Sequence, residues 1–110
     1  MARIKGYALG VMSIDDGEYN NQYSIRVTQH GKEQMEKRNI SAEDVVDSIQ
    51  RIPSAKILYL QEEGRDVCAI DKFLGISVVF SFHGNRIMVV TVFDECDQVF
   101  AKNRTHRVFV

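Results

Sequence analysis

The sequence predicts an α+β domain in which an N-terminal helical hairpin packs on an antiparallel β-sheet of four or five strands. Residues 28–51 carry the signals of two helices joined by a short turn, and most of the following chain consists of β-branched and aromatic runs separated by turn residues. With 110 residues, of which 45% are hydrophobic and 26% charged, the chain is long enough to bury one core. We therefore expect a single domain over residues 1–110.

The second helix of the hairpin has clear start and stop signals. Ser41 stands three residues before Asp44, an arrangement close to a capping box, so the helix should begin after Ser41. Pro53 disfavours helical geometry at the residue before it. The helix is expected over about residues 42–51, with one apolar face formed by residues at helical spacing: Val45, Ile49 and Ile52.

The first helix is expected to begin at Thr28 or Gln29, and Met35 is its only large apolar side chain. At 100° per residue, Gly31 and Met35 point toward the sheet while His30 lies on the opposite, polar face. Asn39 follows where a helix commonly ends in the left-handed conformation. This helix should therefore contact the sheet through a narrow stripe.

The remaining segments are assigned by composition and alternation. Residues 1–22 are predicted to form an N-terminal arm or edge strand, residues 23–93 the core, and residues 94–110 a C-terminal tail. A short strand over residues 23–27 leads into the first helix. Four strands joined by short turns should then follow Pro53, with the sequences AKILYLQ (55–61), RDVCAID (65–71), ISVVFSF (76–82) and RIMVVTVF (86–93).

The last two of these predicted strands are apolar on both faces, with Ile87, Val89 and Phe93 expected on one face and Met88, Val90 and Val92 on the other. Strands with that pattern are usually covered on both faces. The helices cover one face. The second face requires the N-terminal arm, a second copy of the chain, another protein, or the apolar tail residues Val99, Phe100, Val108 and Phe109.

Composition excludes several classes of protein. The net charge of −1 argues against a broad nucleic-acid surface, although residues 102–110 carry a local balance of +3 on a body of −4. Cys68 and Cys96 lack the spacing of a zinc site or a disulfide framework, and we expect no metal or cofactor. No apolar run is long enough to span a membrane or to form the core of a signal peptide, so a cytoplasmic location is expected.

The hairpin carries a short motif of small, polar and apolar residues in a fixed order: His30, Gly31, Met35, Arg38, Asn39, Ile40, Ser41, Asp44 and Val45. With this order, the chain resembles the bacterial domain-of-unknown-function family 4258 over roughly residues 23–93. Gln34 stands where that family commonly has arginine, and Asn39 where it commonly has glycine. The first departure removes a positive charge beside His30.

Through its grouping with RelE-like and BrnT-like toxins, the resemblance implies a ribonuclease or translation inhibitor that acts on RNA by metal-independent acid/base chemistry. It implies His30 as the acid/base and Arg38, Arg104 and His106 as residues that handle phosphate. Such proteins are normally held inactive by a protein antitoxin. Each candidate also has a structural explanation: His30 could bind a backbone carbonyl, Arg38 could satisfy the end of its helix, and the tail charges could be solvated.

A second class of function remains open. The chain could be a non-catalytic interaction module, or an inhibitor belonging to a phage or mobile element, that keeps the fold and binds a protein target on its apolar sheet face. The acidic balance of residues 1–101 suits a partner with a basic surface.

Overall fold

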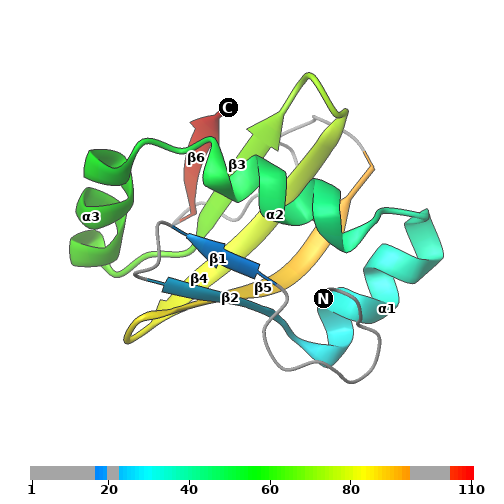
Figure 1. Cartoon of the computed structure of the whole chain (residues 1–110), viewed down its shortest axis with the longest axis horizontal. Coiled ribbons are helices and arrows are strands. Elements are labelled where there is room, and N and C mark those ends of the chain that lie inside the picture. The colour runs from blue at the N-terminus through cyan, green and yellow to red at the C-terminus, as the bar shows by residue number, and fades with distance from the viewer. Residues whose placement is uncertain (1–16, 20–22, 95–104) are drawn as a thin grey trace.

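The structure, a computed structural model, describes residues 17–19, 23–94 and 105–110, and in this part of the chain three helices pack against a six-stranded sheet (Figure 1). Strands β1 (Gly17–Tyr19) and β2 (Tyr23–Val27) come first. They are followed by α1 (Gln29–Arg38), α2 (Ala42–Gln50), α3 (Ser54–Glu63), β3 (Val67–Asp71), β4 (Ile76–His83), β5 (Arg86–Phe93) and β6 (His106–Phe109). The fold is thus α+β as predicted, but the helices follow two strands and are not N-terminal.

The sheet is mixed, so the prediction of an antiparallel sheet is wrong. Its strand order is β1-β2-β5-β4-β3-β6. The predicted meander β3-β4-β5 is antiparallel, whereas β2 pairs parallel to β5 and β6 pairs parallel to β3. Short turns can join only antiparallel neighbours, while the helical layer between β2 and the meander acts as a crossover that allows a parallel pair.

The first two helices form as predicted, and their ends are capped by side chains. The Thr28 hydroxyl accepts a hydrogen bond from the Gly31 amide at 3.0 Å, and the Ser41 hydroxyl accepts one from the Asp44 amide at 3.1 Å. Asn39 ends α1 in the left-handed region, with φ of 57°. Gly31 and Met35 are buried against the sheet, which confirms the expected contact stripe.

The segment predicted as a strand over residues 55–61 is instead helix α3. Its run of apolar residues has no clear period, and only Ile57 and Leu60, three residues apart, are buried. The start signal is Pro53, whose carbonyl accepts the first helical hydrogen bonds, and the stop signal is Gly64 with φ of 70°. The residues that start and stop the helix, and not the apolar run, identify the element.

A β-bulge between β4 and β5 changes which residues of β5 face the helices. Val79 pairs with Thr91 while Phe80 pairs with Val89, which leaves Val90 as the extra residue. Val92 therefore joins the buried cluster under the helices, and the alternation predicted for this strand is wrong beyond Val90. Regular alternation cannot reveal such an inserted residue.

Strand β6 adds an apolar residue to the core from the C-terminal tail. Val108 lies opposite Ala69 of β3 and is buried in the same cluster. Of the other tail residues expected to cover the sheet, Phe109 is largely exposed, and Val99 and Phe100 lie outside the described residues. None of the helices in the described ranges is long and apolar enough to cross a membrane.

Candidate functional site

The two candidates predicted on α1 lie at opposite ends of that helix. His30 is exposed in the first turn. Arg38 is in the last turn, where its Nε donates to Gln34 Oε1 at 3.2 Å, its Nη1 donates to Asp94 Oδ1 at 3.2 Å, and its guanidinium lies 5.3 Å from the Phe93 ring centroid. Gln34, at the position where the family resemblance leads one to expect arginine, thus helps to hold Arg38 in place.

The predicted tail residue His106 lies in a different part of the molecule. Helix α1 packs on β5 and β2, whereas His106 begins β6, which pairs with β3 on the far side of β4 (Figure 1). Arg104 lies outside the described residues. His30 and His106 therefore belong to separate regions, and the chemistry around each has to be judged separately.

His106 sits in a polar cluster that the sequence did not point to. Its Nε2 contacts Arg65 Nη2 and lies 3.7 Å from Glu63 Oε1, and Arg65 Nη2 in turn lies 3.1 Å from the same carboxylate oxygen. The ring of His106 meets Tyr59 edge-on at 5.9 Å between centroids. An imidazole, a carboxylate, a guanidinium and a phenol are thus gathered in one place, which we call the His106 cluster.

The end of α3 and the start of β6 build this cluster together. Gly64 ends α3 directly after Glu63, so that Arg65 and Asp66 turn the chain into β3. The Asp66 carbonyl accepts a hydrogen bond from the His106 amide at 2.8 Å, which fixes the start of β6 against this turn. Glu63, Arg65 and Tyr59 could not be found from the sequence, because their juxtaposition depends on α3 being a helix.

Placing a carboxylate at the C-terminal end of a helix is electrostatically unfavourable, because the helix dipole is negative there. Glu63 is the last residue of α3, and Arg65 supplies the opposite charge. Both side chains are about 40% exposed, so this ion pair contributes little to stability. The cluster is therefore poorly explained as a stabilising feature of the fold.

Arg65 also lines a hollow of about 470 Å³ between the end of α3 and the β4–β5 turn. Gln61 bridges the two elements, because its Nε2 donates to the Gly84 carbonyl at 2.9 Å and its Oε1 accepts from the Tyr23 hydroxyl at 2.5 Å. The hollow can admit a small polar group beside the guanidinium. Its other lining residues are Gly64, Asp66, Ser81, Phe82 and His83.

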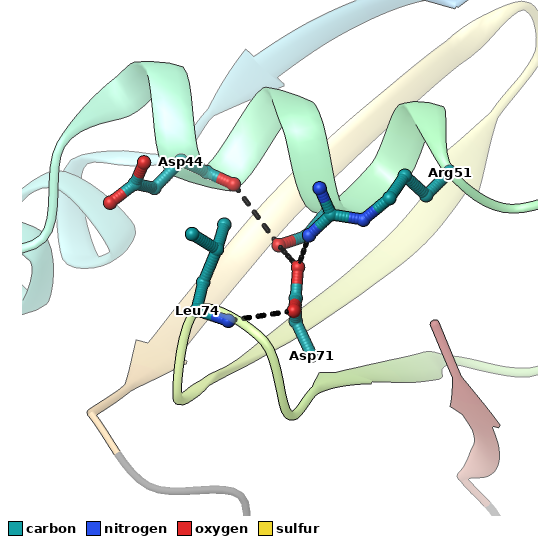
Figure 2. Close-up of polar contacts among 5 residues, drawn as sticks. Asp44, Arg51, Asp71 and Leu74 are labelled. Atoms are coloured by element: carbon teal, nitrogen blue, oxygen red, sulfur yellow. Dashed lines mark hydrogen bonds and ion pairs between the residues drawn. The ribbon is translucent and has the colours of Figure 1, made fainter.

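A second polar cluster surrounds the fully buried carboxylate of Asp71 and serves the fold. The Asp71 carboxylate, at the end of β3, accepts hydrogen bonds from the Ser48 hydroxyl at 2.8 Å and the Leu74 amide at 2.9 Å, and it pairs with Arg51 (Figure 2). The single proton of the Ser48 hydroxyl can alternatively be donated to the Asp44 carbonyl within α2, at 3.0 Å. These contacts fasten α2 to the β3–β4 turn. No group of three His, Cys, Asp or Glu side chains arranged to hold a metal ion occurs in the described part of the chain.

Cys68 lies on the face of β3 that points away from the helices, opposite Arg107 of β6. Burial raises the pKa of the Cys68 thiol above its usual value, and the Arg107 guanidinium opposes this effect more weakly. The thiol is therefore held in its protonated, unreactive form.

We expect Cys68, in a Cys96→Ser background, to react with a thiol-specific chromogenic disulfide at least about 100-fold more slowly in the native protein than in denaturant. Because the folded state favours the protonated thiol, Cys68 makes its full contribution to the free energy of unfolding when the pH is below the ordinary thiol pKa of about 8.5. That contribution is lost as the pH rises through the raised native value. Fast labelling of the native protein would contradict the assignment.

Comparison with known proteins identifies a family for this chain. The family model described as Domain of unknown function (DUF4258) matches residues 27–94, more than half of the chain. The chain belongs to this family. No curated protein and no solved structure matches it. The DUF4258 match contains Tyr59, Glu63 and Arg65 but ends before β6, so His106 joins the cluster from outside the matched region.

Proposed function

We propose that this DUF4258 protein is a toxin-type ribonuclease of the RelE-like group that cleaves RNA by metal-independent acid/base chemistry at the His106 cluster. The observation that carries the proposal is the set of contacts among His106, Glu63 and Arg65 beside the hollow. A carboxylate and an imidazole within reach of one another, next to a fixed cation, are the groups that such a reaction requires.

The groups suit cleavage by the neighbouring ribose hydroxyl. In this reaction the 2′-oxygen attacks the adjacent phosphorus while a base removes its proton, the bond from phosphorus to the 5′-oxygen breaks, and an acid protonates that leaving oxygen. Glu63 is the proposed base and His106 the proposed acid, because imidazolium can donate a proton near neutral pH. The products are a 2′,3′-cyclic phosphate and a 5′-hydroxyl.

Arg65 would stabilise the extra negative charge on the phosphorane in the transition state. Its planar guanidinium offers several donors in a fixed geometry that matches two phosphate oxygens. Tyr59 packs against the imidazole and is proposed as a positioning residue. The hollow beside Arg65 would take the nucleotide that flanks the scissile phosphate.

The test is cleavage of a fluorescent single-stranded RNA by the purified protein in EDTA, with product ends identified. We expect His106→Ala to lower the rate by about 10²- to 10⁴-fold, the usual share of a general acid. His30→Ala is the matched control because His30 is an exposed histidine of α1, which packs on β5 and β2 and lies away from β6 in the strand order. Loss of activity with His30→Ala alone would move the site to α1, and an inactive wild-type protein would overturn the proposal.

A second candidate function, a non-catalytic module that binds an antitoxin or target protein, is favoured by β6. This strand closes one end of the sheet order, and an edge strand can pair with a strand of another chain. Normal growth and intact RNA in a bacterial host that expresses the wild-type protein would support this candidate. Growth arrest that His106→Ala abolishes would support the ribonuclease.

A further inference from the structure

Two large aromatic side chains are exposed near the end of β3, and each lies under a cation. Phe73, in the β3–β4 turn, is 86% exposed, and Phe109, in β6, is 54% exposed. The Arg51 guanidinium lies 5.9 Å from the Phe73 ring centroid, and the Lys72 ammonium lies 5.2 Å from the Phe109 centroid. We call these four residues the cation–aromatic strip.

The turn that presents Phe73 is held by hydrogen bonds to Asp71. The Leu74 amide donates to the Asp71 carboxylate, and the Gly75 amide donates to the Asp71 carbonyl at 2.8 Å. Leu74 packs against the core, whereas Phe73 points outward and adds almost nothing to core packing. A turn held in this way loses little backbone freedom when a ligand stacks on its exposed ring.

The charges of the strip are suited to an anionic ligand. The carboxylate of Asp71 is fully buried and is occupied by Ser48, Leu74 and Arg51, whereas the Arg51 side chain remains 40% exposed and Lys72 is exposed. Positive groups at the surface can contact phosphates while the exposed rings stack on bases. Stacking requires bases that are not already paired within a duplex.

We propose that the cation–aromatic strip binds single-stranded RNA. This inference builds on the proposed ribonuclease, because it supplies a second site on the same substrate. Strand β6 runs from His106 to Phe109, and three residues of extended strand span about 10 Å. Side chains alternate along β6, so His106 shares the helix-covered face with Val108 whereas Phe109 lies on the opposite face. Because β6 is the last strand in the sheet order of the described residues, an RNA of a few nucleotides would pass around this edge from the His106 cluster to the strip.

Binding is tested by fluorescence anisotropy with a labelled 12-nucleotide 2′-O-methyl RNA, which lacks the attacking hydroxyl and cannot be cleaved. Phe73→Ala should weaken binding by about 5- to 150-fold, the range expected for loss of one base–aromatic stack. Lys72→Gln should make the salt dependence less steep, by about 0.7 in the logarithmic slope. The matched controls, Leu58→Ala at another exposed apolar position and Lys37→Gln on α1, should bind like the wild type.

The strip proposal would be overturned if Phe73→Ala and Leu58→Ala bound the RNA with equal affinity. It would also be overturned if the wild-type protein bound a duplex of the same sequence equally well, or bound another protein but not the RNA. Cleavage of a dinucleotide separates the strip from the proposed function, because a dinucleotide held by its single phosphodiester at the His106 cluster has no further nucleotides to occupy the strip. Wild type and Phe73→Ala should cleave the dinucleotide equally. A wild-type protein that cleaves the dinucleotide but binds the 12-nucleotide RNA no more tightly than Phe73→Ala overturns the strip alone. Binding of that RNA that depends on Phe73, without any cleavage, overturns the ribonuclease alone.

Discussion

Replacing Asp71 with alanine is expected to lower the free energy of unfolding by about 3 kcal/mol. The carboxylate is fully buried, and its removal would leave the Leu74 amide without this acceptor and the buried Ser48 hydroxyl with only the Asp44 carbonyl. It would also remove the partner of Arg51, the residue that caps the C-terminal end of α2 (Figure 2). The loss should appear in chemical denaturation followed by circular dichroism.

The matched control removes the other partner of the same ion pair. The Arg51 side chain is 40% exposed, so in Arg51→Gln the carboxylate keeps its two other donors and water can reach the vacated position. We expect a loss of about 1 kcal/mol. Equal losses for the two variants would show that the ion pair, and not the buried hydrogen bonds, holds α2 to the β3–β4 turn.

Gly31→Ala is expected to destabilise the protein by about 2 kcal/mol, even though alanine is the better helix former by ~1 kcal/mol. A Cβ atom at residue 31 would lie 2.8 Å from Val27 Cγ1 and 2.9 Å from the Val89 carbonyl oxygen. That oxygen is part of the backbone and accepts a hydrogen bond from the Thr28 amide, so it cannot give way. Helix α1 would have to move off the sheet.

The measurement is again the unfolding free energy, with hydrogen exchange of α1 amides to localise the effect. Lys37→Ala, at an exposed position of the same helix, controls for helix propensity and should be nearly neutral. A Gly31→Ala protein more stable than the wild type would mean that propensity outweighs the close approach. Its α1 amides would then exchange no faster than before.

Local signals in the sequence were sufficient for α1, α2 and three of the four strands of the predicted meander. Caps such as Ser41 and Asn39 act within a few residues, and the structure has them at the predicted positions. Helix α3 was predicted as a strand because Ile57 and Leu60 sit in an apolar run that fits either period. The parallel strand pairs depend on contacts between distant residues, which no local pattern encodes.

The candidate site was predicted in part. His106 was named from the basic tail, but its partners Glu63 and Arg65 come from a helix end that was not foreseen. Arg38, one of the two arginines predicted to handle phosphate, is engaged by Gln34 and Asp94, which offers a structural role for it. A three-dimensional neighbourhood built from distant segments could be recognised only once the fold was known.

The parallel pairing of β2 with β5 also bears on how the chain folds and where it can be divided. Ser24 lies opposite Arg86, so this pair closes a loop that contains all three helices and strands β3 and β4. Closing so long a loop is slow, and α1 cannot dock until both strands beneath it have met. The matched region begins at Val27, the last residue of β2, so a fragment cut at those limits would lack the strand that completes the sheet under α1. The unit that folds cooperatively is thus larger than the unit by which the family is recognised.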